Sequence, residues 1–145
     1  MNQSLEVLLY GMQFRKLMEY EFGTIQQKYN LCKIDIQILY YLYTAGVHNT
    51  SRDILDLKLF TKGHISQSLR RLQKMKLITM IQDKDDRRYV HNVLTQEANE
   101  VIAGLEQGYE DINKIIFKDI TEEEKKELIL LAQKINHNIK TTLSA

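Results

Sequence analysis

Two short runs rich in β-branched and aromatic residues flank a run of charged residues, and this arrangement constrains the fold most. The runs are LITMIQ at residues 77–82 and YVHNVL at residues 89–94, and the six residues Asp83–Arg88 between them are all charged. Runs of this length and composition around a polar turn predict an antiparallel β-hairpin. The chain has no proline and only six glycines, which favours helices elsewhere. We therefore expect a mainly α fold that contains one small β-hairpin.

Apolar residues recur at helical spacing through most of the chain outside the hairpin. Three helix starts can also be recognised: Asp35 can cap one helix, Thr50 or Ser51 another, and Thr121 with Glu124 makes a T-x-x-E capping box. The predicted helices cover residues 5–28, 35–46, 51–58, 62–75, 95–117 and 121–139. No repeat, low-complexity tract or flexible linker separates them, so we expect one architectural unit.

Composition and motif content argue against several classes of protein. No apolar run approaches the roughly 20 residues that span a bilayer, and the N-terminal residues lack the features of a signal peptide. The single cysteine, Cys32, suits a reducing compartment. The histidines lack metal-ligand spacing, and the sequence has no glycine-rich phosphate loop, nucleophile motif or catalytic carboxylate pair. We expect a cytoplasmic protein that is not an enzyme, with no membrane association, cofactor or bound metal.

The charges are unevenly distributed, although the net charge is only +1. Residues 50–95 carry ten Lys or Arg against five Asp, a net charge of +5, so the remainder of the chain carries −4. A basic middle between acidic flanks is expected when only the middle approaches phosphate groups. The segment 50–95 is therefore the candidate for binding a nucleic acid.

Within this segment, two predicted helices are joined by about three residues, Leu59–Thr61, which is the arrangement of a helix-turn-helix. A helix fits the major groove when one stripe is anchored to a core and the opposite face offers hydrogen-bonding groups to base edges. The second helix has such a polar face, whose candidate contacts are Lys62, His64, Ser66, Gln67, Arg70 and Arg71. The alternative is an ordinary amphipathic helix whose polar face is only solvated.

The turn of the predicted hairpin is unusually charged. A turn that only has to be hydrated would more commonly use Asn-Gly or Asp-Gly, whereas this one has three Asp and three Lys or Arg. An aspartate can hold an arginine by an ion pair while the guanidinium group projects into a narrow minor groove. In this interpretation Arg87 and Arg88 contact DNA and Asp86 positions them. The alternative is a hydrated turn with no partner.

Residues 50–95 resemble the winged helix of the MarR family of bacterial transcription regulators, whose wing carries a D-x-x-D-x-R pattern followed by a strand and Leu-Thr. The matching residues are Asp83, Asp86 and Arg88 in the wing, VLT at 93–95 after it, and SLRRLQKMKLI at 68–78, which resembles the end of the recognition helix. The sequence departs from the family pattern at three positions. Lys76 and Ala98 stand where the family often has glycine, and Lys84 stands where the wing often has proline.

The resemblance implies a winged helix-turn-helix with terminal dimerisation helices. It implies that residues 1–145 form a single MarR-type unit, in which 35–95 are the DNA-binding lobe and 1–30 and 96–145 form the dimerisation region. Such a homodimer would bind a pseudo-palindromic operator in double-stranded DNA as a sequence-specific regulator. The family further implies a repressor that responds to a small phenolic or anionic ligand.

The same resemblance suggests further contact residues by their position. In the wing, Lys84 joins Asp86, Arg87 and Arg88 as a candidate for DNA contact. Other candidates are Ser51, Arg52 and Thr61 for the DNA backbone, and Arg15, Tyr43 and His91 for the lining of a ligand pocket.

Two other functions are compatible with the residues. One is a winged-helix protein-interaction module that does not read DNA, and its binding would not weaken steeply with salt as phosphate contacts do. The other is a redox sensor that acts through the thiol of Cys32, in which peroxide would weaken DNA binding by the native protein but not by Cys32→Ser.

Overall fold

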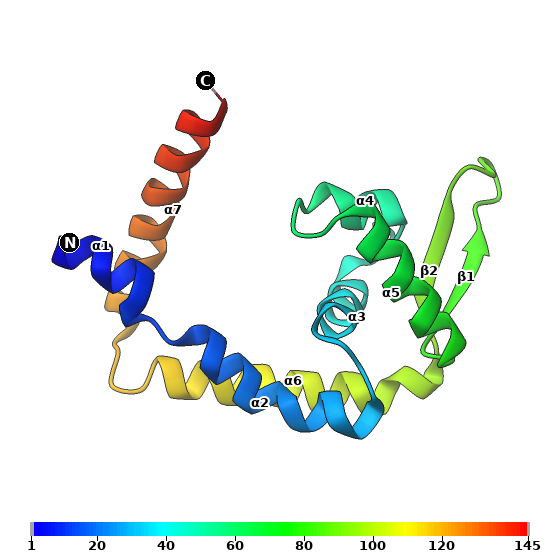
Figure 1. Cartoon of the computed structure of the whole chain (residues 1–145), viewed down its shortest axis with the longest axis horizontal. Helices are drawn as coiled ribbons and strands as arrows, with labels where there is room; N and C mark the ends of the chain where they lie inside the picture. The colour runs from blue at the N-terminus through cyan, green and yellow to red at the C-terminus, as the bar shows by residue number, and fades with distance from the viewer. Residues whose placement is uncertain (1, 145) are drawn as a thin grey trace. The chain divides into compact units, whose positions relative to one another are not determined.

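The computed structural model describes residues 2–144. The chain divides into two compact units, Met1–Tyr109 and Glu110–Ala145. In chain order the elements are α1 (Gln3–Glu6), the π-helix η1 (Val7–Gly11), α2 (Phe14–Tyr29), α3 (Lys33–Ala45), α4 (Ser51–Asp56), α5 (Lys62–Lys74), β1 (Ile78–Gln82), β2 (Val90–Leu94), the 3-10 helix η2 (Gln96–Ala98), α6 (Asn99–Ile116) and α7 (Glu122–Ser144) (Figure 1). The predicted mainly α fold with one antiparallel hairpin is confirmed.

The first predicted helix is wrong as a single element, because the chain leaves the helical conformation between η1 and α2. Met12 has an extended backbone with φ −100° and ψ 116°, and α2 begins only at Phe14. Gly11, the last residue of η1, contributes no side chain that would favour continuing the helix. Apolar residues keep a helical spacing on both sides of this break, so the periodicity did not reveal it.

The helix starts follow from side chains that satisfy free backbone N–H groups. Three threonine hydroxyls act as N-caps, each accepting from the N–H three residues later: Thr50 from Asp53 (3.2 Å), Thr61 from His64 (3.2 Å) and Thr121 from Glu124 (3.1 Å). The Glu124 carboxylate accepts in return from the Thr121 N–H at 2.9 Å, which confirms the predicted capping box.

The start of α3 differs from the prediction. The helix begins at Lys33, so Asp35 lies in its first turn instead of preceding it. From there the Asp35 carboxylate accepts from the Cys32 N–H at 2.9 Å. Asp35 therefore does cap the helix, but from inside the first turn.

The core of the first unit lies between α3, α5, the hairpin and the first half of α6. On α5 the apolar residues Ile65, Leu69 and Leu72 are buried, whereas Met75, just after the helix, is exposed. The buried apolar residues of these elements are Ile36, Ile38, Leu39 and Leu42 on α3, Ile65, Leu69 and Leu72 on α5, Ile78 on β1, and Val101, Ile102 and Leu105 on α6. The outer faces of α4 and α5 are thereby left free to make polar contacts.

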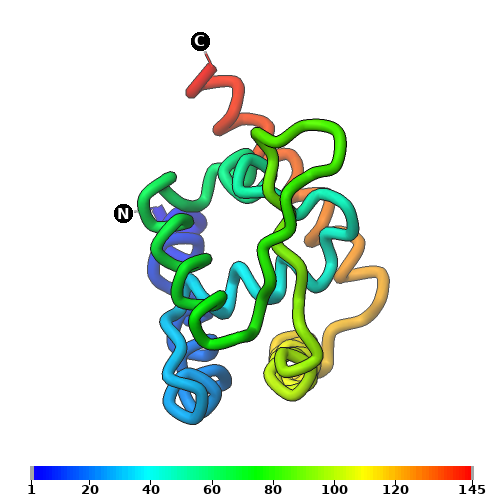
Figure 2. Tube along the Cα trace, turned by 90° about the vertical axis from the view of Figure 1, so that its right-hand side faces the viewer, coloured from blue at the N-terminus to red at the C-terminus, as the bar shows by residue number. Residues whose placement is uncertain are grey.

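The hairpin is a two-stranded antiparallel sheet in which Ile78 pairs with Leu94 and Gln82 pairs with Val90. The turn connecting the strands lies at the end of the hairpin far from α6 (Figure 2). The hairpin is also joined to the loop before α4, because the Asn92 N–H donates to the Asn49 carbonyl oxygen at 3.1 Å. We call residues 78–94 the wing.

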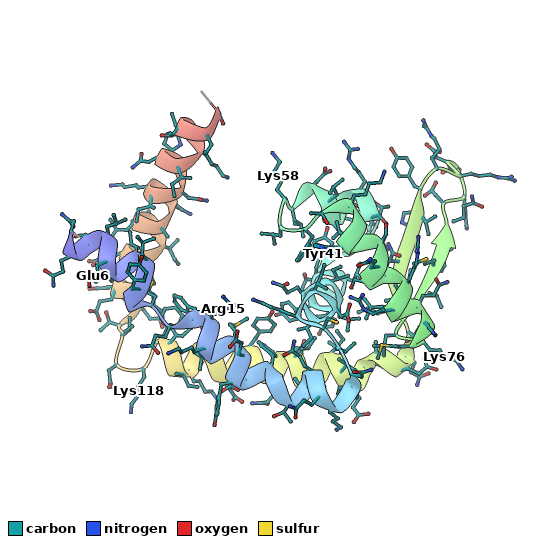
Figure 3. The ribbon with its side chains drawn as sticks, viewed as in Figure 1. Glu6, Arg15, Tyr41, Lys58, Lys76 and Lys118 are labelled. Carbon is teal, nitrogen blue, oxygen red and sulfur yellow. The ribbon has the colours of Figure 1, made fainter. Side chains whose placement is uncertain are left out.

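Lys76 lies in the connection between α5 and β1 (Figure 3). Its backbone is in the left-handed conformation, with φ 63°. Glycine adopts this conformation without strain, and lysine adopts it at a small cost. The backbone is held there because the Lys76 N–H donates to the Gln73 carbonyl oxygen at 3.0 Å and the Thr95 hydroxyl donates to the Lys76 carbonyl oxygen at 2.6 Å. Lys76 thus adopts the backbone conformation that glycine would adopt at this position, and the connection between α5 and β1 is kept.

In the second unit, α7 extends to Ser144, beyond the predicted end near Ile139. Among the helices of residues 2–144, none combines the length and the apolar character that crossing a bilayer requires.

Candidate nucleic-acid interface

A cleft of about 660 Å³ lies between the helix-turn-helix and the wing. Its polar lining comes from Ser51 and Arg52 at the start of α4, Lys62 and Ser66 on α5, and Arg88 just before β2. Five residues that the sequence singles out for DNA contact therefore share one concave surface, although they come from three separate elements. We call this surface the cleft.

The N-terminal end of α5 faces this cleft through Lys62 and Ser66. The first N–H groups of a helix and its dipole together create partial positive charge that attracts phosphate. Thr61 is the N-cap residue of α5, because its hydroxyl accepts a hydrogen bond from the His64 N–H. The structure therefore accounts for Thr61 through the helix start, and a DNA contact from it is a separate prediction.

The wing holds Arg88 through Asp86. Asp86 Oδ1 accepts from Arg88 Nε at 3.0 Å and from the Arg88 backbone N–H at 3.0 Å, and Oδ2 accepts from Nη2 at 2.8 Å. These bonds hold the pKa of the Asp86 carboxyl below its usual value. The Arg88 side chain is still 85% exposed, so the pair orients the guanidinium group without burying it. Because an exposed ion pair contributes little to stability, the effect of this pair is geometric.

Arg87 and Lys84 are placed differently from Arg88. The backbone carbonyl of Arg87 accepts from Gln82 Nε2 at 3.0 Å, which ties the wing turn to the end of β1. Both side chains belong to exposed residues of the turn. Asp86 thus orients Arg88, whereas the sequence interpretation assigned it both arginines.

Arg71, a predicted DNA contact, has a partner within the protein. Its Nη2 lies 2.8 Å from Asp35 Oδ1 and its Nε lies 3.2 Å from Asp35 Oδ2, so α5 is joined to α3. The Ser68 hydroxyl donates to the same carboxylate at 2.6 Å. Burial disfavours ionisation of Asp35, but the hydrogen bonds from Arg71, Ser68 and the Cys32 N–H outweigh it and hold the pKa of this carboxyl below its usual value.

The contacts of Asp35 with Arg71 and Ser68 were not predicted from the sequence. The sequence does carry a signal, because Asp35 is followed by mostly apolar residues at 36–43, and a carboxylate that becomes buried among them requires a cation or several donors. The identity of the partner could not be read from the sequence, since Arg71 is 36 residues away.

The remaining candidates on α5 stay available. Lys62, His64, Gln67 and Arg70 are exposed, and Ser66 is half-buried. Apart from Arg71, which pairs with Asp35, the residues of the α5 face predicted to read bases are therefore accessible.

The three residues suggested for a ligand pocket have separate partners. Arg15, on α2 (Figure 3), pairs with Glu19 at 3.2 Å. On α3, a hydrogen bond with Glu106 raises the pKa of Tyr43. His91, on β2, contacts Asn49 and Asp83. These contacts do not assemble Arg15, Tyr43 and His91 into one site.

Two further features concern metal and redox chemistry. Among residues 2–144, no group of His, Cys, Asp and Glu side chains is arranged to hold a metal ion. Cys32 is a free thiol and is exposed at the residue preceding α3.

Comparison with known proteins agrees with this geometry. Residues 31–98 match the protein family described as "Winged helix DNA-binding domain". No curated protein matches the sequence. The structural matches are at low sequence identity, so they establish the fold.

Three solved structures illustrate the likeness. The chain is similar to a MarR/EmrR family transcriptional regulator from Acinetobacter sp. ADP1, with a TM-score of 0.77, 20% identity, and coverage of 97% of this chain and 99% of that one. It is similar to a MarR protein from Peptoclostridium difficile, with a TM-score of 0.78, 18% identity and coverage of 94% and 89%. It is also similar to S. aureus MepR in a DNA complex, with a TM-score of 0.72, 21% identity and coverage of 89% and 97%.

The fold and the cleft define a winged helix protein, in which a helix-turn-helix and a wing share one basic surface. Its fold is similar to that of the MarR and MepR proteins compared above. Of these three, the Acinetobacter protein is a transcriptional regulator, and the S. aureus MepR structure is a complex with DNA.

Proposed function

We propose that the protein is a sequence-specific regulator of transcription that binds double-stranded DNA through α5 and the wing. The observation that carries the proposal is the cleft, where Ser51, Arg52, Lys62 and Ser66 of the helix-turn-helix meet Arg88 of the wing. In this arrangement α5 enters the major groove, and Arg88 reaches the adjacent minor groove. The charge of +5 on residues 50–95 supports the same surface.

The roles within the interface follow from chemistry and placement. Gln67 and Arg70 on the exposed face of α5 are proposed to read base edges, because Gln pairs with adenine and Arg with guanine. Ser51 and Arg52 are proposed to contact the DNA backbone, since they lie at the start of α4 beside the cleft. Arg71 is left out, because the buried Asp35 carboxylate already engages it.

The proposal includes a homodimer. Both terminal segments expose apolar side chains that a second copy of the chain could cover. Examples are Leu8 (48% exposed), Leu9 (57%) and Tyr10 (68%) on η1, and Ile129 (55%), Leu130 (59%) and Leu131 (57%) on α7. In such a dimer the two α5 helices would read half-sites about 10 bp apart, which gives a pseudo-palindromic operator.

We extend the proposal to repression that responds to a small phenolic or anionic ligand. Arg15, Tyr43 and His91 have separate partners, so their contacts do not by themselves support a ligand pocket. The extension therefore rests on the resemblance to MarR regulators. A ligand would release DNA only if it bound more tightly to a dimer whose α5 helices have a spacing incompatible with the operator.

The test is DNA binding measured against salt. A duplex is first selected from a random-sequence pool by the purified protein, and its affinity is then measured by fluorescence anisotropy at several salt concentrations. We expect the logarithm of the affinity to fall steeply with the logarithm of the salt concentration, because phosphate contacts release counterions. A flat response would instead favour the protein-interaction module.

A further inference from the structure

The imidazole ring of His91 lies between the wing turn and the loop that precedes α4. Its Nδ1 is 2.6 Å from Asn49 Oδ1, and its Nε2 is 2.7 Å from Asp83 Oδ1. The ring is half-buried, with 29% of the side chain exposed. Both ring nitrogens are therefore within hydrogen-bonding distance of an oxygen, one on each side of the ring.

Asp83 connects this ring to the residues of the turn. While its Oδ1 contacts His91, its Oδ2 accepts from the Asp85 N–H at 3.0 Å and from the Asp86 N–H at 2.9 Å. The hydrogen bonds from His91 and from these two N–H groups hold the pKa of Asp83 below its usual value. The backbone of Asp86, whose carboxylate holds Arg88, is therefore fixed through Asp83.

Asn49 connects the same ring to the helix-turn-helix. Its carbonyl oxygen accepts from the Asn92 backbone N–H at 3.1 Å and from Asn92 Nδ2 at 2.9 Å, and Asn92 is only 2% exposed. The next residue, Thr50, forms a β-bridge with His91 and caps α4. A hydrogen-bonded path thus runs from the start of α4, through His91 and Asp83, to the residue that orients Arg88.

The wing needs such support because the restraints within it do not fix its turn relative to α4. Its two strands have five residues each, and a two-stranded hairpin is at best marginally stable alone. Glycine or proline would favour one turn conformation, but the turn contains neither residue. The exposed Asp86–Arg88 pair orients the guanidinium group relative to the turn but does not orient the turn relative to α4.

We propose that Asn49, His91 and Asp83 form a brace that positions Arg88 for DNA, an inference that rests on the proposed function. His91 is then a positioning residue that acts through Arg88, and not a residue of a ligand pocket. The brace sets the placement of the wing relative to α4, where Ser51 and Arg52 line the cleft.

The DNA test is a double-mutant cycle on the selected duplex, with the variants His91→Ala, Arg88→Ala and the combination. We expect His91→Ala to weaken binding at least about five-fold, and to weaken it no further when Arg88 is already alanine. A loss of the same factor in both backgrounds would overturn the proposal, because His91 would then act independently of Arg88. Asp83→Asn reaches the brace from its other side, so it carries the test if His91→Ala does not fold.

A second measurement, without DNA, separates the brace from the proposed function. We expect faster hydrogen exchange of the Asp85 and Asp86 amides in His91→Ala, and no change in the control His137→Ala on α7. Unchanged exchange in His91→Ala would overturn the brace even if the protein binds DNA. Faster exchange in a protein whose DNA affinity does not depend on salt would overturn the proposed function and, with it, the role of the brace in DNA binding.

Discussion

The fully buried carboxylate of Asp35 lies 2.8 Å from Nη2 of Arg71, and this pair joins the first turn of α3 to the helix proposed to read DNA. The Ser68 hydroxyl donates to the same carboxylate at 2.6 Å. A buried carboxylate is tolerated only when donors or a cation satisfy it. The position of α5 on α3 is therefore held by hydrogen bonds to the Asp35 carboxylate as well as by apolar packing.

Removing Arg71 should destabilise the protein strongly. Arg71→Ala leaves the Asp35 charge buried with fewer donors, and breaking a fully buried pair costs about 3–5 kcal/mol. Because the Arg71 side chain is 39% exposed, solvent screens the pair, and we expect a smaller loss of about 2–3 kcal/mol in the free energy of unfolding. Urea denaturation measures this loss. The control is the exposed neighbour Arg70→Ala, expected within about 0.5 kcal/mol of wild type, and equal losses would contradict the assignment.

Stability should fall in acid partly because of Asp35. The pKa of this carboxyl in the folded protein is lower than its ordinary value of 3.8, so the unfolded chain binds a proton more readily. The stabilisation is therefore fully present above about pH 4 and is lost as the pH falls through the lowered pKa of the folded state. Unfolding free energies measured from pH 7 to pH 3 should fall more steeply in wild type than in Asp35→Asn. Parallel curves would show that Asp35 does not contribute.

Arg88→Ala should remove most DNA binding while the protein stays folded. The side chain is 85% exposed and its ion pair is on the surface, so its loss should change stability little. If Arg88 also contacts a phosphate, the dependence of log affinity on log salt should lessen by about one. A gel-shift titration and a thermal melt test both parts, with the exposed Arg15→Ala as control. Wild-type affinity in Arg88→Ala would disprove the wing assignment.

Gly108→Ala should destabilise the packing of α6 on α2. A Cβ atom at this position would lie 2.7 Å from Cε1 of Phe22, whose side chain is buried. Phe22 also contacts Tyr109, with ring centroids 4.9 Å apart, so it has little room to move. We expect a cost of about 1–3 kcal/mol, measured by thermal unfolding.

Gly63→Ala is the matched control for this change. Gly63 lies near the start of α5, and a Cβ there meets nothing within 4 Å. Alanine should therefore stabilise the helix by up to about 1 kcal/mol. If both variants shifted stability in the same direction, the contact between Gly108 and Phe22 would not explain the first result.

Local features were predictable from the sequence because the determining residues are close together along the chain. Thr121 and Glu124 are three residues apart, and the wing residues Asp86 and Arg88 are two apart. The apolar stripe of α5 follows directly from helical periodicity. The predicted face of α5 and the predicted wing consequently meet at the cleft, as Lys62 and Arg88 show.

The sequence by itself determined the mainly α fold with its single hairpin, the capping box of Thr121 and Glu124, and the polar face and charged wing that line the cleft. Only the tertiary structure decided that Arg71 pairs with Asp35, 36 residues away, and that His91 contacts Asn49, 42 residues away. Periodicity shows which face of a helix is polar, but it does not show which distant side chain that face meets. Such partners depend on how the elements pack, because groups far apart in sequence are brought within hydrogen-bonding distance only by the folded core.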